Sequence, residues 1–264
     1  MSQSITQPRY IQPSQLVPQH LTRYNTRKIK HVIFSGGFTI NVIYWSDYAC
    51  PFCYIGAEII KKAFASLHTD GKLHLIMKSF ELDPTAPSYV VSSTPERFAR
   101  KYGMTLAQAT ARIEAISEMG REAGIDFRYA STQYASTLDA HRITKLAQNK
   151  YSNNTAEKLS ASLYGAYFTR NLELSNHDML IHEGINAGLS EEDIRAVLES
   201  NAYEADVRND EKEAYSKGIH SVPFFVIEGK YHISGAQSLD AMAETLRRGL
   251  DVRAMSCGAE GCLL

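Results

Sequence analysis

The stretch YWSDYACPFCYIG, residues 44–56, places two cysteines one helical turn apart, at a point where the hydrophobic pattern changes period. Before it, TINVIYWSD (39–47) is short, β-branched and aromatic, which is typical of a largely buried strand. After it, apolar residues recur at every fourth position, at Ile55, Ile59, Ala63 and Leu67, which predicts a helix. Pro51 is tolerated in the first turn of a helix. We therefore expect Cys50 to lie where a strand ends and a helix begins.

The two cysteines have different expected roles because they differ in their depth along that helix. The sulfur of Cys50 faces the unpaired N–H groups of the first turn and the positive end of the helix dipole, which favour thiolate over thiol. Cys50 is the candidate nucleophile, and Cys53 is the candidate resolving thiol that attacks a mixed disulfide on Cys50. The intervening Pro-Phe adds no positive charge, which predicts a mild oxidant. Asp47 either opposes the thiolate or accepts the resolving proton, and the sequence leaves both roles open.

Two other interpretations of the pair remain. A C-P-x-C motif also occurs in zinc knuckles, and Cys257 with Cys262 would complete a set of four thiolate ligands. The helix that begins directly after Cys53 and the looser second spacing count against zinc. Alternatively the pair is inert, because free cysteine is often a small core hydrophobe.

Composition narrows the class of partner. The chain has 264 residues and a net charge of −1, with 28 Lys and Arg against 29 Asp and Glu, so it has no basic field for nucleic acid or anionic membrane. A small molecule or a protein is the expected partner. No apolar run approaches the roughly 20 residues of a membrane helix, and residues 1–30 hold no secretory signal, so we expect a soluble, cytoplasmic protein. Thiols stay reduced there unless they do chemistry.

The rest of the chain divides by hydrophobic period. Residues 1–38 predict a disordered extension, with a targeting segment and an overlong gene start as alternatives. LHLIMKSF (73–80) predicts a second strand, residues 94–217 are helical in pattern, and two short strands follow at 222–229 and 230–236. The turn between those two strands falls at Glu228-Gly229-Lys230; the last helix is expected from Ser238 to about Arg248, with Gly249 as its stop.

Val222-Pro223 is the second informative position. A proline at the head of a strand cannot donate to the sheet ladder, so it belongs at the first residue or on an edge. The alternative is a cis proline packed against the cysteine pair.

Taken together, these motifs resemble the DsbA family of thiol-disulfide oxidoreductases, and in particular its cytoplasmic FrnE-like branch. The resemblance rests on CPFCYIG (50–56), FELDP (80–84), DAHR (139–142), VPFFV (222–226) and SGAQ (234–237), and it covers residues 39–250. It implies an α/β chain with a thioredoxin-like fold and a large all-helical insertion. The thioredoxin-like domain would span 39–84 and 216–250, the insertion 85–215, and a flexible tail 251–264.

The resemblance also implies site residues. Cys50 is the nucleophile, Cys53 the resolving cysteine and Pro223 a cis proline, and Val222 offers backbone hydrogen bonds to an extended partner segment. No cofactor or metal is implied. The partners would be disulfide-containing proteins or small thiols such as glutathione.

Two further groups of residues keep two interpretations each. CGAEGC matches a C-x4-C found in some FrnE-like proteins, so Cys257 and Cys262 are either exposed tail thiols or a second redox pair that exchanges with the active site. Asp139 and Arg142 face each other on a helix, which favours a structural pair, whereas His141 facing the cleft would assist proton transfer.

Three functions compete. The first is a protein-disulfide oxidoreductase or isomerase. The second is a glutathione-dependent isomerase or transferase of the 2-hydroxychromene-2-carboxylate isomerase or kappa type, in which a serine is expected in place of Cys50. The third is a zinc-binding interaction module.

Overall fold

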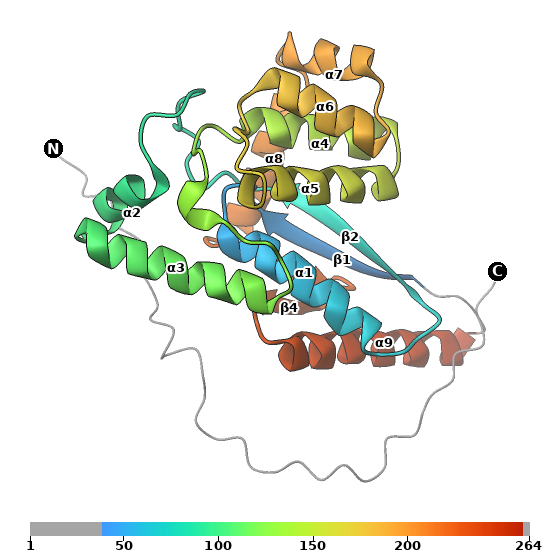
Figure 1. Cartoon of the computed structure of the whole chain (residues 1–264). Helices are drawn as coiled ribbons and strands as arrows, with labels where there is room; N and C mark the ends of the chain where they lie inside the picture. Colours follow the sequence, from blue (N-terminus) through green and yellow to red (C-terminus); the bar gives the residue numbers. More distant parts are fainter. Residues whose placement is uncertain (1–38, 261–264) are drawn as a thin grey trace, which may run out of the picture. The chain divides into compact units, whose positions relative to one another are not determined.

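A mixed sheet of four strands forms the centre of the fold, in the order β2-β1-β3-β4 (Figure 1). The computed structural model describes the backbone of residues 39–260 and the side chains of residues 39–250; the extension predicted for residues 1–38 lies outside the described residues. The strands are β1 (Thr39–Ser46), β2 (Lys72–Ser79), β3 (Phe224–Ile227) and β4 (Tyr231–Ser234). β1 pairs parallel with β2 and antiparallel with β3, and β3 pairs antiparallel with β4. All four strands were predicted from the sequence within three residues of their observed ends.

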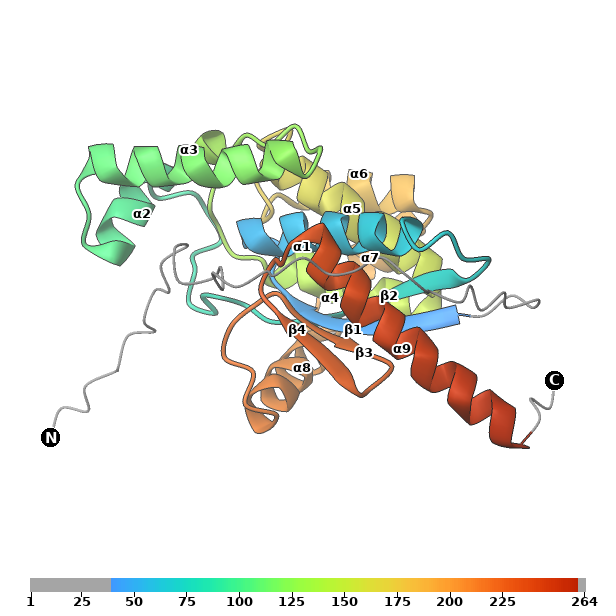
Figure 2. The same cartoon turned by 90° about the horizontal axis from the view of Figure 1, so that it is seen from below.

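The alternation of side chains along β1 builds a core on each face of the sheet, because successive residues of a strand point to opposite sides. Ile40, Val42 and Tyr44 join a large core that includes residues of α1 (Pro51–Ala65) and α9 (Leu239–Glu260). Trp45 instead joins a smaller core with Ala214 of α8 (Glu204–Ser216). Figure 2 shows α8 on the side of the sheet opposite α1.

The helical insertion lies between β2 and β3, as predicted. It contains α2 (Thr94–Tyr102), α3 (Leu106–Glu122), the 3-10 helix η2 (Tyr129–Ser131), α4 (Leu138–Lys150), α5 (Asn153–Phe168), α6 (His177–Ala187), α7 (Glu191–Leu198) and α8. Among the helices in residues 39–260, none combines the length and the apolar character needed to cross a membrane. The fold is thioredoxin-like and carries a large helical insertion.

The turn between β3 and β4 lies where the sequence placed it. Glu228 and Gly229 both adopt positive φ, at 49° and 66°, and the N–H of Lys230 donates to the carbonyl of Ile227 at 3.1 Å. Glycine suits this conformation because it has no Cβ to clash.

The predicted end of the last helix is wrong. α9 begins after Ser238 as expected, but it continues past Arg248 to Glu260, so residues 251–260, predicted as part of a flexible tail, are helical. Gly249 does not end the helix. A Cβ added there would lie 2.7 Å from Cγ2 of Ile227, so this glycine lets α9 approach the sheet closely.

Candidate active site

Cys50 occupies the junction between β1 and α1, as the change of period predicted. It is the N-cap residue of α1, with an extended backbone at φ −87° and ψ 114°, and Pro51 follows in the first turn. Its N–H donates to the carbonyl of Asp47 at 3.1 Å, which closes the turn after β1. The sulfur thus lies at the N-terminal end of the helix, where the first N–H groups lack partners within the helix.

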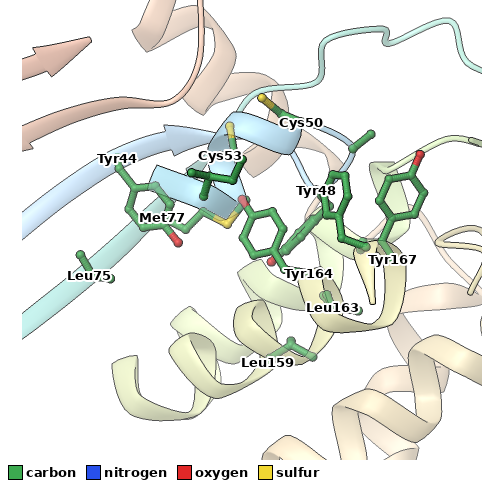
Figure 3. Close-up of a cluster of buried hydrophobic side chains, with 14 of the residues drawn as sticks. Tyr44, Tyr48, Cys50, Cys53, Leu75, Met77, Leu159, Leu163, Tyr164 and Tyr167 are labelled. Atoms are coloured by element: carbon green, nitrogen blue, oxygen red, sulfur yellow. The ribbon is translucent and has the colours of Figure 1, made fainter. Parts of the chain in front are cut away.

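Cys53 lies one turn further along and is fully buried. Figure 3 shows its sulfur on the same side of the view as that of Cys50, with Tyr44 and Tyr164 close by. Burial raises the pKa of the Cys53 thiol well above its usual range, and hydrogen bonding to Cys50 raises it further, although the Ser46 hydroxyl and the backbone of Asp47 act against the rise. Cys53 is therefore a protonated thiol in the form with two free cysteines.

Val222 and Pro223 come from the far end of the sequence to the same place. The Val222-Pro223 peptide bond is cis, which confirms the sharper of the two expectations. The sulfur of Cys50 lies 3.7 Å from the carbonyl oxygen of Val222, to which the thiol donates. Val222 precedes Phe224, the first paired residue of β3, so its backbone has no partner in the sheet ladder.

Gly56 is a site residue that the sequence reasoning missed. A Cβ at this position would lie 3.2 Å from Cγ of Pro223 and 3.2 Å from the ring of Phe225. The absence of a side chain lets α1 approach Pro223, and so brings the two cysteines close to it. Gly56 ends the quoted CPFCYIG motif, but spacing alone does not reveal which helix glycine packs against a strand.

Asp47 and His141 are brought together although they lie far apart in the chain. The Asp47 carboxylate accepts the N–H groups of Ala49 at 3.2 Å and Leu82 at 2.8 Å, and its Oδ1 lies 3.6 Å from Nε2 of His141. That distance is beyond hydrogen-bond range, so the contact is electrostatic. Burial acts to raise the pKa of Asp47, but His141 and the two N–H donors outweigh it and the pKa is lowered.

His141 is fully buried on α4, and neither of its ring nitrogens has a hydrogen-bond partner within the described residues. Its ring packs on Tyr48, with 5.0 Å between the ring centroids. A second buried carboxylate, Glu81, interacts electrostatically with His141 and forms a salt bridge with Arg208 at 2.5 Å. Burial raises the pKa of Glu81 even though His141 and Arg208 oppose the rise. The sequence reasoning missed Glu81, because nothing in FELDP marks a carboxylate that will be buried.

Asp139 and Arg142 form the structural pair that was favoured. Their side chains meet at 2.7 Å, and the guanidinium of Arg142 also donates to the carbonyls of Val197, Ser200 and Ala202. Arg142 thus ties α4 to the C-terminal end of α7.

Both side chains of the second cysteine pair lie beyond the described side chains. Cys257 is in α9, and Cys262 is outside the described residues. Within residues 39–250, no three His, Cys, Asp or Glu side chains are grouped as a metal site requires.

Comparison with known proteins finds relatives for the part of the chain that holds the sheet and the insertion. Residues 41–247 match the family model described as DSBA-like thioredoxin domain. A probable DsbA oxidoreductase from Streptomyces coelicolor, SCO1869, has a crystal structure that covers 80% of this chain and 90% of its own, with 33% identity and a TM-score of 0.74. The cytosolic disulfide reductase DsbM from Pseudomonas aeruginosa, solved with GSH, covers 82% and 98%, with 13% identity and a TM-score of 0.52. The uncharacterized protein YwbO of Bacillus subtilis (strain 168) is 24% identical over 213 residues, which are 79% of this chain and 96% of YwbO.

Proposed function

Because the chain belongs to the DSBA-like thioredoxin-domain family, we propose that it is a thiol-disulfide oxidoreductase whose dithiol is Cys50 and Cys53. The observation that carries the proposal is the position of Cys50, which caps α1 with its sulfur 3.7 Å from the Val222 carbonyl and with the protonated Cys53 one turn behind it. Its substrates are the disulfides of proteins or of small thiols such as glutathione.

The proposed reaction is two successive exchanges. In the reducing direction, the Cys50 thiolate attacks one sulfur of the substrate disulfide, the S–S bond breaks, and the other substrate sulfur leaves as a thiolate. Cys53 then loses its proton and attacks the Cys50 sulfur, which releases the second substrate thiolate and forms the Cys50–Cys53 disulfide. The substrate gains the two electrons that the dithiol loses. Oxidation of a substrate dithiol is the reverse sequence.

Val222 and Pro223 are proposed to bind the substrate backbone. An extended segment would lie beside Val222, ahead of β3, and hydrogen-bond to its main chain in the manner of an added strand. The backbone of Val222 suits this because it takes no part in the ladder that starts at Phe224.

Asp47 and His141 are proposed to take up the resolving proton. The backbone of Asp47 hydrogen-bonds to Cys53, and its carboxylate contacts His141, so a buried acid–base pair adjoins the thiol that must ionise. In Asp47→Asn, release of the second substrate thiol should slow relative to release of the first. An unchanged ratio of the two rates would remove Asp47 from this role.

Trapping experiments test the proposal. A Cys53→Ser variant should accumulate a stable mixed disulfide with the substrate, visible by intact mass, because the resolving sulfur is missing. The matched Cys50→Ser variant should form no adduct and reduce no insulin. Insulin reduction by Cys50→Ser at the wild-type rate would end the proposal.

Two further proposals concern redox direction and location. Titration against glutathione gives the reduction potential of the pair. A value near about −270 mV would indicate a reductant, and a value near about −120 mV would indicate an oxidant.

We propose that the protein is located in the cytoplasm, where clustered cysteines stay reduced and available for exchange. Fractionation of the native cell tests this location.

Cys257 and Cys262 are proposed as a second redox pair that exchanges with the first. Thiol trapping after partial oxidation should then find a disulfide between Cys257 and Cys262 in the wild type and none there in Cys50→Ser.

Two competing functions predict different results. An isomerase or transferase would turn over a chromene with glutathione, and this activity would survive Cys53→Ala. A zinc module would retain stoichiometric zinc through dialysis.

A further inference from the structure

A cluster of basic and aromatic side chains lies beside Cys50, and the steps above do not use it. Its members are Arg97 and Lys101 of α2, Tyr134 in the segment after η2, and Tyr167 of α5. Figure 1 shows α2 beyond the N-terminal end of α1. In Figure 3 the Tyr167 hydroxyl points away from α5, to the same side of the view as the Cys50 sulfur. Lys101 interacts electrostatically with both Cys50 and Arg97, so it links the cluster to the sulfur of Cys50.

Arg97 is held in place by an aromatic ring rather than by a carboxylate. Its guanidinium carbon lies 3.6 Å from the centroid of the Tyr134 ring, and the Tyr134 hydroxyl donates to Asp83 at 3.3 Å, which fixes that ring. Nε of Arg97 is buried without a hydrogen-bond partner, and no carboxylate of the described residues forms a salt bridge with this guanidinium. A stacked guanidinium leaves its edge free, and that edge matches the two oxygens of a carboxylate.

Tyr167 adds a second donor without an acceptor. The residue is 1% exposed, and no hydrogen bond within the described residues reaches its buried hydroxyl. The Thr132 hydroxyl lies near enough to lower the pKa of Tyr167, but it is engaged with the Tyr129 carbonyl and with Thr94. Burial dominates and raises the pKa of Tyr167 to about 12, so the hydroxyl keeps its proton and can donate. An unsatisfied buried donor is unfavourable, and an incoming acceptor would remove that cost.

The charge balance of the cluster favours an anion. Lys101 forms no salt bridge with the carboxylates of the described residues, and its Nζ lies 5.8 Å from the centroid of the Tyr102 ring. The acidic groups that face it are Asp83, which is bonded to Thr85 and Tyr134, and Asp47, which is bonded to Ala49 and Leu82. Lys101 therefore interacts with both Cys50 and Arg97, while the neighbouring carboxylates are occupied.

We propose that Arg97, Lys101 and Tyr167 form a subsite that binds a carboxylate of the disulfide substrate while Cys50 attacks its sulfur. The inference rests on the proposed function and adds a substrate class to it: thiols and disulfides that carry a carboxylate near the sulfur. Such a carboxylate comes either from a small molecule of the glutathione type or from an acidic residue beside the cysteine of a peptide.

Single-turnover kinetics test the subsite without any added reductant. The fully reduced protein is mixed with oxidised glutathione or with the neutral 2-hydroxyethyl disulfide, and the loss of protein thiols is followed by acid quench and intact mass. The readout is the rate constant for oxidised glutathione divided by the rate constant for 2-hydroxyethyl disulfide. Arg97→Gln should lower this ratio about tenfold, the effect expected when one charge-assisted hydrogen bond is lost. Arg97→Lys should restore part of it, because lysine keeps the charge but not the fork. Tyr167→Phe should lower it several-fold.

Arg128→Gln is the matched control, because this exposed guanidinium of the same insertion is paired with Asp126 at 2.6 Å, and its loss should leave the ratio unchanged. Two peptide disulfides that differ only by Glu or Gln beside the cysteine form the second arm. If Arg97→Gln lowers the Glu-to-Gln peptide rate ratio more than it lowers the ratio for oxidised glutathione, the carboxylate belongs to a peptide. If it lowers the ratio for oxidised glutathione more, the carboxylate belongs to a small thiol. A ratio that is the same in Arg97→Gln and wild type, for both substrate pairs, overturns the subsite. A wild type that reacts with neither kind of disulfide overturns the proposed function instead.

Discussion

Cys53 shows how a single buried residue couples the chemistry of the site to the stability of the fold. Its sulfur is fully buried, and its neighbours include Tyr44 and Tyr164 (Figure 3). Burial raises the pKa of its thiol well above the ordinary value of 9.0. The thiol of Cys53 therefore stays protonated in the reduced protein. In the proposed reaction, this would separate attack by Cys50 from resolution by Cys53.

The raised pKa of Cys53 predicts a loss of stability in alkaline solution. In the unfolded chain this thiol ionises near 9.0, whereas in the folded chain it stays protonated to higher pH. The stabilising contribution is thus complete below the unfolded pKa and is lost as pH rises toward the folded one, with a slope of up to about 1.4 kcal/mol per pH unit. Urea unfolding of the reduced protein should show a steeper loss of unfolding free energy between about pH 8 and pH 10 in the wild type than in Cys53→Ala. Parallel curves for the two proteins would contradict this prediction.

At the scale of elements, close approaches assemble the site. Gly56 lets α1 lie against Pro223 and Phe225, and Gly249 lets α9 lie against Ile227. Arg142 joins α4 to the end of α7 and the loop that follows it, through the carbonyls of Val197, Ser200 and Ala202. These contacts fix where the helices lie against the sheet and against one another, which the pattern of helices and strands alone does not do.

Gly56→Val tests the approach of α1 to Pro223. The added side chain would overpack the contact with Pro223 and Phe225, and we expect it to lower the unfolding free energy by about 1–3 kcal/mol. Gly165→Val is the matched control, because a Cβ at this position of α5 meets nothing within 4 Å, and the change should be within about 0.5 kcal/mol. Urea midpoints of both variants give the comparison. Equal losses at the two positions would show that Gly56 is not needed for packing.

At the scale of the whole molecule, the sheet and the insertion share one core. The larger core joins Val42 and Phe225 of the sheet to Leu159 and Leu180 of the insertion helices without interruption. Residues 39–260 also fall within a single compact unit. The insertion is therefore continuous in packing with the thioredoxin-like part, even though the chain enters and leaves it through β2 and β3.

A shared core predicts one cooperative unfolding transition. Trp45, the single tryptophan, packs with Ala214 and donates to the Asp210 carbonyl at 3.0 Å, so its fluorescence reports on the sheet and α8. Far-UV circular dichroism reports mainly on the insertion helices. The two signals should give the same urea midpoint. Separate midpoints would show that the insertion unfolds as an independent domain.

The sequence by itself determined most of the elements and the position of the cysteine pair, because both depend on local pattern. The change of period at Pro51 predicted that Cys50 begins a helix, and the later switch to short strands predicted the hairpin around Gly229. The end of α9 could not be predicted in the same way, since Gly249 is typical of a helix stop and only the nearby Ile227 shows its packing role.

Tertiary structure alone decided which distant residues surround the pair. Nothing in local spacing indicates that His141 lies 3.6 Å from Asp47, or that Arg97 stacks on Tyr134. Burial and desolvation depend on the side chains that the fold brings in from other elements, so the protonated state of Cys53 follows from the completed core. The motif identifies the sulfurs proposed to react, and the surrounding fold sets the protonation of Cys53.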